Sequence, residues 1–578
     1  MARHGNDHAV LVLVRQLRMP GAVAAALLAF GSFLFMWPFA RLDFDRHHDG
    51  YMLAQAIAVH QGASIHADVF AQYGPVTPWL QSLALFLPMG PGLALRTINV
   101  VVIACTIFFL ADMGRKRPSD WPVTRAVGWW AAVSWIVLSD VWMGIPMLPW
   151  SSTVAAMLSV MTLYFLTRSF WFAEVGYSTR ASAMAFAAGV SVGLMPFTRL
   201  NVGLSALVVC LIALALIIYV ERGARRTRAI IFMGGTLLSF LIVVVILAHA
   251  NSLADFYYQS IKWPLTWGRN ATQDWKTREN LTRIFTIQAL PAALVIIVLI
   301  LQIRTRSVQR GWSPTKSGVM LFTVLVGLVI AFWENWPLTA FAPNSDYIYF
   351  FMVLSVIVAV LTCIIVTFKL LSGDKSLEQL VPWFLLGGLA LSGLSQIVPT
   401  WDPRHVWWGI PVGLLLLFSI VYSTSNLNKL SGNPLTIPLL LVTGMAVLSG
   451  SVYWGSQRVE GQPGTVIEGM LVTKIEFNQI NQDTEFLRRY LLGYESIVYL
   501  VDDGDLSVLD GRYRSADPYF VDWGGFPSVE SRTRTRIPVV VQTSTIGEAK
   551  IRELAHSIDY EIIARNPRLV VLMPMHSS

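Results

Sequence analysis

The sequence predicts a mainly α-helical membrane protein with about 13 transmembrane helices and a small α/β domain after them. Of its 578 residues, 54% are apolar and only 13% are charged, whereas a soluble domain has about 25% charged residues. The mean hydropathy is +0.56. Many windows contain more than about 18 apolar residues, enough to cross a hydrocarbon core about 30 Å thick. From residue 455 onward the composition changes to alternating strand and helix patterns.

The apolar windows define the expected crossings one by one. They lie near 20–40, 97–113, 126–146, 150–167, 182–198, 203–220, 229–249, 287–304, 318–334, 348–369, 381–398, 405–422 and 433–453. The apolar segment 76–90 is short and bracketed by prolines. We therefore expect it to form a re-entrant or interfacial helix rather than a crossing.

The distribution of positive charge predicts the orientation. With the N-terminus in the cytoplasm, the inner segments carry 20 Lys and Arg residues, and the outer segments before residue 454 carry 10. Cytoplasmic loops are enriched in these residues, and this bias also accounts for the net charge of +8. The sequence thus predicts a multi-pass plasma (inner) membrane protein with a cytoplasmic N-terminus and an extracytoplasmic C-terminal domain.

The chain is expected to consist of two domains. Residues 1–454 form the predicted transmembrane domain, with a long first outer loop at 41–96 and a second at 250–286. Residues 455–578 form the predicted soluble α/β domain. Its expected strands lie near 496–501, 537–541 and 569–573, and its expected helices near 478–492 and 546–557.

The densest polar cluster follows the first crossing, between Arg41 and Tyr51, where three carboxylates and two imidazoles fall within seven residues. Ionisable groups at membrane depth are costly and often functional. A carboxylate there can act as general base for an acceptor hydroxyl. Asp43 and Asp45 are also spaced to place oxygens on one divalent cation, Mg²⁺ or Mn²⁺. The alternative is that these charges solvate the loop and anchor the first crossing in the headgroups.

The order of residues in this loop resembles the first loop of the GT-C membrane glycosyltransferases. The resembling residues are His47-His48-Asp49-Gly50-Tyr51, then Gly62, Asp68, Tyr73-Gly74-Pro75 and Trp79-Leu80-Gln81. The resemblance implies an inverting hexosyl- or pentosyltransferase that uses a polyprenyl-phosphate sugar donor. It implies Asp49 as the base that activates the acceptor, with Asp45 and His48 as further catalytic candidates. Gly50 departs from the acidic pair of some relatives, so Asp43, Asp45 or Asp68 is left to supply a second carboxylate.

Other polar residues at the outer ends of the crossings are candidate binding groups. Arg404 can bind a phosphate bidentately, with His405 donating to the same oxygens, and Arg199 lies at a tight turn between two crossings. Each can instead anchor the protein among lipid headgroups. The full predicted binding set is Asp43, Asp68, Gln72, Tyr73, Arg199, Arg404 and His405.

The predicted function is transfer of a sugar from a polyprenyl-phosphate carrier to a glycan, lipid or protein acceptor on the outer face of the plasma membrane. The expected partners are that donor, that acceptor and the lipid bilayer, and no nucleic acid. Two alternatives remain open: a flippase or transporter of lipid-linked saccharides, and a polymerase or ligase of surface glycans. A flippase would need polar residues near the middle of its crossings, whereas here they gather at one set of ends.

Overall fold

The computed structural model describes most of the chain. The described residues are 21–118, 121–139, 147–220, 223–265, 346–372, 377–397, 403–424, 458–501, 503–509, 512–513, 537–544 and 546–575. The predicted crossings at 287–304, 318–334 and 433–453 lie outside these residues, as does the predicted domain boundary at 454/455.

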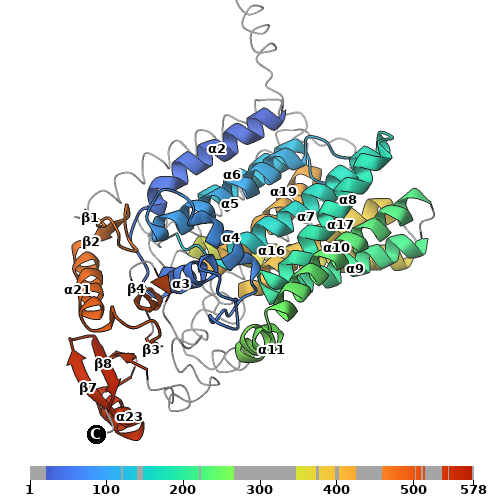
Figure 1. The fold of residues 1–578 in the computed structure, drawn as a ribbon. Helices are drawn as coiled ribbons and strands as arrows, with labels where there is room; N and C mark the ends of the chain where they lie inside the picture. The colour runs from blue at the N-terminus through green and yellow to red at the C-terminus, as the bar shows by residue number, and fades with distance from the viewer. Residues whose placement is uncertain are drawn as a thin grey trace, which may run out of the picture.

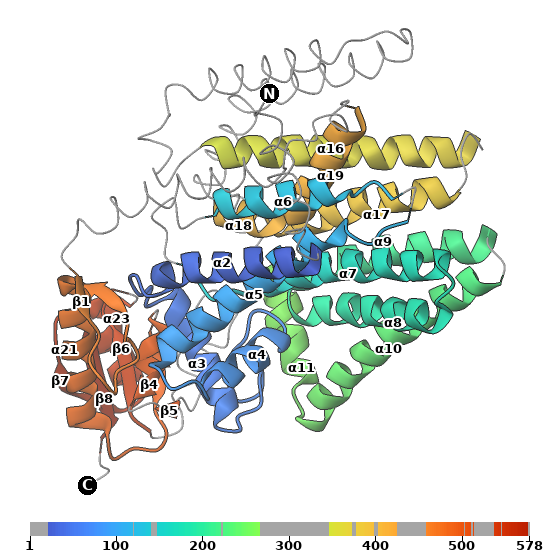
Figure 2. The ribbon, with the colours of Figure 1, turned by 90° about the horizontal axis from the view of Figure 1, so that it is seen from above.

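The described part is mainly helical, with roughly parallel helices in layers and an α/β unit at one end (Figures 1 and 2). In the described residues up to 265, the helices are α2 (Gly21–Ala40), α3 (His48–His60), α4 (Val76–Ala84), α5 (Pro91–Met113), α6 (Arg125–Val137), α7 (Ser151–Glu174), α8 (Ser178–Leu194), η2 (Met195–Phe197), α9 (Leu200–Val220), α10 (Ala224–His249), α11 (Leu253–Tyr257) and η3 (Tyr258–Lys262). In those from 346 to 424, they are α16 (Asp346–Ser372), α17 (Leu377–Leu394), η6 (Ser395–Ile397), α18 (Pro403–Gly409) and α19 (Pro411–Thr424).

Six helices of the described part are long and apolar enough to cross a membrane. They are Gly21–Ala40, Pro91–Met113, Ser151–Glu174, Ser178–Phe197, Arg226–His249 and Met352–Lys369. Shorter apolar helices cover Leu200–Ala215, Leu380–Leu394 and Pro411–Ser423. The multi-pass prediction is therefore confirmed for these segments. By contrast, α4 has nine residues and spans only about 13 Å at 1.5 Å per residue, which is too short to cross.

Small residues allow the apolar helices to approach closely. A Cβ atom on Gly189 of α8 would lie 2.1 Å from the carbonyl oxygen of Phe232 in α10, and one on Gly235 of α10 would lie 2.4 Å from that of Phe186. Without a hydrophobic driving force between helices in lipid, such close backbone packing is a main source of association. α8 accordingly packs extensively against both α10 and α7.

The C-terminal α/β unit is built on a four-stranded sheet in the order β3-β6-β8-β7. Its strands are β3 (Val498–Leu500), β6 (Val539–Gln542), β7 (Tyr560–Arg565) and β8 (Leu569–Pro574), with β3 parallel to β6 and the other pairs antiparallel. Helix α23 (Glu548–Ser557) and helix α21 (Lys474–Leu491) flank the strands, and the short elements are β1 (Arg458–Glu460), β2 (Leu471–Thr473), η8 (Gly504–Ser507), β4 (Val508–Leu509) and β5 (Arg512–Tyr513). The three strands and two helices expected from the sequence are present, within a few residues of their expected ends.

Local sequence explains where α21 begins. The Thr473 side chain accepts a hydrogen bond from the backbone N–H of Glu476, and the Glu476 carboxylate accepts one from the backbone N–H of Thr473. This capping box satisfies two backbone donors that the first turn of a helix leaves free. The start of α21 is thereby fixed directly after β2.

The α/β unit contacts the first loop at several points. Leu42 forms an isolated β-bridge with Leu471, in which the Asp43 N–H donates to the Leu471 carbonyl at 2.8 Å and the Leu471 N–H donates to the Arg41 carbonyl. Gly50 and Gly504 approach so closely that a Cβ on Gly50 would lie 3.2 Å from the Gly504 nitrogen. The first loop and the C-terminal unit therefore lie on the same side of the helices (Figure 2).

Candidate active site

The residues predicted to be catalytic lie at the start of α3, immediately after the turn that follows α2. Asp45 shapes this turn, because its Oδ1 accepts a hydrogen bond from the His48 N–H at 2.9 Å and its carbonyl accepts from the Asp49 N–H at 2.8 Å. Asp43 precedes it with a positive φ of 52°, a conformation that Asp tolerates better than most residues. The turn thus directs Asp43, Asp45 and Asp49 toward different partners.

Asp49 lies in a buried ion pair with Arg96 of α5. The Arg96 Nε donates to Asp49 Oδ1 at 3.1 Å, its Nη2 pairs with Oδ2, and its Nη1 donates to the Leu42 carbonyl at 2.6 Å. The two side chains are 2% and 0% exposed. Burial raises the pKa of Asp49 above its usual value, and Arg96 opposes that rise. This carboxylate faces Arg96 rather than solvent, which differs from the position expected for a base that meets an acceptor.

Asp45 and His48 form a more accessible pair. Asp45 Oδ2 lies 2.7 Å from His48 Nδ1, and the side chains are 26% and 31% exposed. Burial alone would raise the pKa of Asp45, but the hydrogen bond and charge of His48 outweigh it and lower the pKa to about 2. A carboxylate at Nδ1 favours the tautomer whose other nitrogen, Nε2, carries a free lone pair. His48 is thus oriented as a proton acceptor.

Trp150, the residue before α7, joins His48 to the second half of the first loop. Its ring centroid lies 5.3 Å from that of His48 and 5.4 Å from that of Tyr73, both in edge-on geometry. The Gln72 N–H donates to the Tyr51 hydroxyl at 2.7 Å, and the Tyr51 ring lies 6.2 Å from Trp150. The predicted binding residues Gln72 and Tyr73 therefore share one aromatic wall with His48.

Arg199, which follows η2, also contacts the Tyr73 ring. Its guanidinium carbon is 4.9 Å from the centroid of the Tyr73 ring. Its Nη1 donates to the Ser152 hydroxyl at 2.5 Å and its Nη2 to the Gln396 carbonyl at 3.5 Å. The residue is 6% exposed. Tyr73 is thus in contact with both Trp150 and Arg199, which links the cation to the His48 end of the site.

Several buried polar atoms of Arg199, of Gln396, and of the two residues before Ser152 have no hydrogen-bond partner among the described residues. They are Trp150 Nε1, Ser151 Oγ, Arg199 Nε and Gln396 Oε1. Most buried polar groups are paired, so such a concentration requires an explanation. Three of these four atoms carry a hydrogen to donate. Donors around a guanidinium are the chemistry that binds an anionic oxygen, and these residues fit a phosphate.

The remaining predicted residues lie elsewhere. Asp68 is exposed in a turn, where its Oδ2 accepts from the Ser64 N–H at 2.7 Å. Arg404 and His405 are half-buried in α18, and the His405 ring contacts Trp408. Helix α18 packs on η6, the element that carries Gln396. The structure therefore places α18 next to the Arg199 region but shows no contact between Arg404 and Arg199.

Asp43 and Asp45 do not share a cation site in the structure. The Asp43 carboxylate receives hydrogen bonds from Arg458 at 3.0 and 3.1 Å, whereas Asp45 pairs with His48. Across the described ranges, no group of three or more His, Cys, Asp or Glu side chains is arranged to hold a metal ion. The predicted pair therefore does not fit a shared Mg²⁺ or Mn²⁺ ion.

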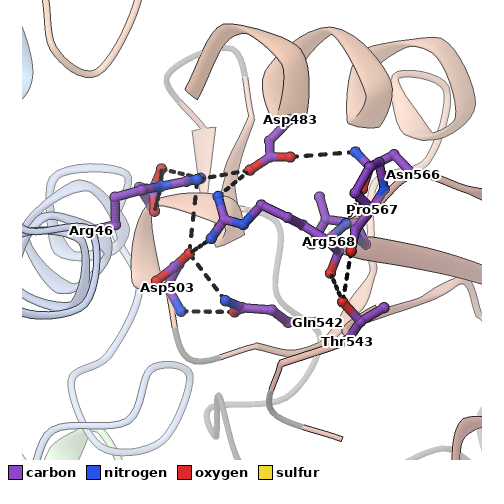
Figure 3. Close-up of polar contacts among 10 residues, drawn as sticks. Arg46, Asp483, Asp503, Gln542, Thr543, Asn566, Pro567 and Arg568 are labelled. Carbon is purple, nitrogen blue, oxygen red and sulfur yellow. Dashed lines mark hydrogen bonds and ion pairs between the residues drawn. The ribbon is translucent and has the colours of Figure 1, made fainter. Parts of the chain in front are cut away.

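Arg46, between the candidate catalytic residues, enters an acidic cluster of the C-terminal unit (Figure 3). Its Nε and Nη2 donate to Asp505 Oδ2 at 3.0 and 2.8 Å, and its Nη1 donates to Asp483 Oδ2 at 2.7 Å. Arg568 also donates to Asp483 Oδ2 at 2.7 Å and pairs with Asp503. This network fixes the first loop to the α/β unit.

Sequence reasoning missed the groups that complete the site. Trp150, Ser151, Ser152 and Gln396 lie at helix ends, and Arg96 lies inside the first turns of α5. The only signal in the sequence was their position, since all of these residues lie at or near the ends of apolar helices. The second loop contributes as well, because Gln259 Nε2 donates to the His66 carbonyl at 2.8 Å and its Oε1 accepts from the Ala71 N–H at 2.9 Å.

Comparison with known proteins finds similarity only at the level of solved structures. No model of a known protein family matches the chain, and no curated protein matches it. The structure is similar to the crystal structure of ArnT from Cupriavidus metallidurans bound to undecaprenyl phosphate, with 12% identity and a TM-score of 0.44. It is also similar to the apo form of ArnT from that organism, with 13% identity and a TM-score of 0.42. Each comparison covers 96% of this chain and 98% of the other.

Proposed function

We propose that this chain is a GT-C-type membrane glycosyltransferase that moves a sugar from a polyprenyl-phosphate carrier to an acceptor hydroxyl on the outer face of the membrane. One observation carries the proposal. A histidine oriented by a carboxylate contacts Trp150, and a buried arginine contacts Tyr73, the other ring of the same aromatic wall. Donors near this arginine have no hydrogen-bond partner in the part of the chain that the structure describes. The wall lies at the ends of helices long enough to span a membrane.

The donor phosphate is assigned to the Arg199 region. The guanidinium and the neighbouring donors of Trp150 and Ser151 would bind the phosphate oxygens, and the polyprenyl tail would lie along the apolar helices. When the bond between the anomeric carbon and the phosphate oxygen breaks, negative charge grows on the departing polyprenyl phosphate. Preorganised donors stabilise that charge in the transition state without rearranging.

The acceptor is assigned to the His48 end. As the acceptor oxygen forms its bond to the anomeric carbon, its proton passes to His48 Nε2, and Asp45 stabilises the imidazolium through Nδ1. A single displacement of this kind inverts the anomeric configuration. Asp45 itself is a weak base because its pKa is about 2, and efficient general bases have a pKa near the operating pH. We therefore propose His48 as the base and Asp49 as a positioning residue.

No step is assigned to a divalent cation, because Asp43 and Asp45 have separate partners. Arg404 and His405 stay in the proposal as residues of α18 that border the donor region, and Asp68 has no assigned role.

The test is transfer by purified protein in proteoliposomes, given a radiolabelled polyprenyl-phosphate sugar and an envelope extract as acceptor. Release of polyprenyl phosphate that requires the extract is the readout, because it can be measured without knowing which molecule of the extract is the acceptor. His48→Gln should lower transfer by about 10²–10⁴-fold, and Arg199→Met by about 10²–10³-fold. His47→Gln is the matched control and should keep transfer. Movement of the intact donor across the bilayer without cleavage would show a flippase and refute the proposal.

A further inference from the structure

A groove on the α/β unit, which shares Asp483 with the cluster around Arg46, has a lining that neither the sequence analysis nor the proposed reaction uses. Its volume is about 670 Å³, and it lies between α21 and the turn that joins β7 to β8. Its lining residues are Ile475, Asn478, Gln479, Gln482, Asp483, Glu485, Phe486, Arg489, Asn566, Pro567 and Arg568. A volume of this size suits a ligand of several rings, since small-molecule pockets span about 300–1,000 Å³.

The wall from α21 is a polar stripe with helical spacing. Its members recur at intervals of three and four residues from Ile475 to Arg489, which places them on one face of the helix. Asn478 and Gln482 are exposed. Neither amide hydrogen-bonds to the described part of the chain, so both can serve a ligand. An amide offers a donor and an acceptor side by side, the pattern that a sugar hydroxyl requires.

An aromatic ring and an arginine complete the same stripe. Phe486 is half-buried, and its ring lies 5.2 Å from that of Tyr490, which limits its movement. Arg489 and Glu485 have side chains that are 68% and 80% exposed, with their charged atoms 3.9 Å apart. The ring supplies an apolar face for the C–H side of a sugar, and the two charges balance each other.

The floor of the groove is rigid. Asn566 Nδ2 donates to Asp483 Oδ1 at 3.3 Å, and Asn566 Oδ1 accepts from the Arg568 and Leu569 backbone at 2.8 and 2.6 Å (Figure 3). With its amide oxygen toward Arg568, Gln479 accepts from Nε and Nη1 at 3.0 Å each. Every charged group of the floor is therefore already paired. A ligand finds fixed walls and loses little free energy to ordering them.

We infer that this groove binds a neutral oligosaccharide. An anionic chain would need a cation that is not already committed, and Arg568 is held by Asp483, Asp503 and Gln479. A peptide would use a continuous apolar groove or the edge of a sheet, whereas four of the eleven lining side chains here are amides and only one is aromatic. Exposed amides, one ring and balanced charge match a chain of hydroxyl groups. The inference concerns binding alone and holds whether or not the transfer reaction takes place.

The test uses the full-length protein in nanodiscs, without donor. The probe is the neutral oligosaccharide fraction released by mild acid from the cell envelope of the source organism, and binding is followed by saturation-transfer NMR. Gln482→Ala, and separately Phe486→Leu, should each weaken binding by about tenfold or more. Phe486→Leu keeps an apolar side chain but removes the ring. Gln462→Ala is the matched control, because Gln462 is also an exposed glutamine of this unit and lies outside the groove.

Absence of saturation transfer to the wild-type protein would overturn the inference. Equal binding by wild type and both groove variants would overturn it too, as would an equal loss in Gln462→Ala. The proposed reaction fails separately: His48→Gln and Arg199→Met should bind the oligosaccharides normally. Binding that survives in a chain without transferase activity would refute the proposed function and support this inference.

Discussion

Replacing Arg46 by methionine should reveal how strongly the first loop is fixed to the α/β unit. The Arg46 side chain is 8% exposed, and those of Asp483 and Asp505 are 3% and 4% exposed. Asp483 would keep Arg568 as a partner, but Asp505 would lose the only cation that it contacts in the described part of the chain. Removing one member of a buried ion pair costs about 3–5 kcal/mol, mostly because the remaining charge stays buried and unpaired.

The assay is pulse proteolysis of the purified protein over a urea series, which gives the free energy of unfolding of the α/β unit. Arg41→Met is the control. It loses an ion pair with Glu460, which is 61% exposed, and one hydrogen bond to the Gly469 carbonyl, so its cost should be only about 1–2 kcal/mol. Arg46→Met with Asp505→Asn should recover much of the loss, since no unpaired charge then remains. Equal losses for the Arg46 and Arg41 variants would refute the reasoning.

The same variant should respond to pH in a defined direction. Burial raises the pKa of Asp505, and Arg46 opposes that rise, so the pKa in Arg46→Met is higher still. A raised folded-state pKa means that stability is present at low pH and is lost as the pH rises and the carboxylate ionises. The difference in the free energy of unfolding between wild type and Arg46→Met should therefore shrink as the pH is lowered from about 7 to about 4. A difference that is constant over this range would show that Asp505 is not its source.

Three further predictions concern the first loop. Asp49→Asn should reduce the yield of folded protein, because it leaves the buried Arg96 unpaired at a cost of about 3–5 kcal/mol. The double variant Asp49→Asn with Arg96→Met should restore the yield, measured by size-exclusion chromatography. Failure of this rescue would argue against a positioning role for Asp49. Gly74→Ala should lower transfer, since its Cβ would lie 2.0 Å from the Phe197 carbonyl oxygen, whereas Gly31→Ala meets nothing within 4 Å and should be neutral. Burial lowers the pKa of His66 from 6.5 to about 4. Between these two values the unfolded loop binds a proton that the folded loop does not, so the resistance of the loop to proteolysis should fall as the pH drops through this range. His66→Gln should abolish that pH dependence.

The sequence predicted the apolar helices well because the need to bury about 20 apolar residues leaves few alternatives. The dense polar cluster between Arg41 and Tyr51 could also be identified from the sequence, and its place in an active site stays a prediction. The alternation of the C-terminal strands and helices could likewise be predicted, since Val539–Gln542 and Leu569–Pro574 are β-rich runs with turn residues nearby.

The assignment of roles within the loop could not be made from the sequence. Asp45 and Asp49 are chemically identical, and only their partners differ: Arg96 lies 47 positions from Asp49 and His48 lies three from Asp45. Nothing local distinguishes Arg96, which pairs with Asp49, from Arg199, whose Nε has no partner among the residues that the structure describes. Pairing between residues far apart in the sequence decides which charged side chains form structural ion pairs and which are available for chemistry.

The β-bridge between Leu42 and Leu471 bears on how the protein is made. Arg41 Nε donates to the Gly469 carbonyl across 428 positions of sequence, so the start of the loop meets its partner only after most of the polypeptide has left the ribosome and been inserted. At about 5–20 residues per second of synthesis, the 428 positions between the two residues take roughly 20–90 seconds, and the loop cannot be completed sooner. Nascent chains stalled before Gly469 should therefore be inactive although their early helices are already in the bilayer.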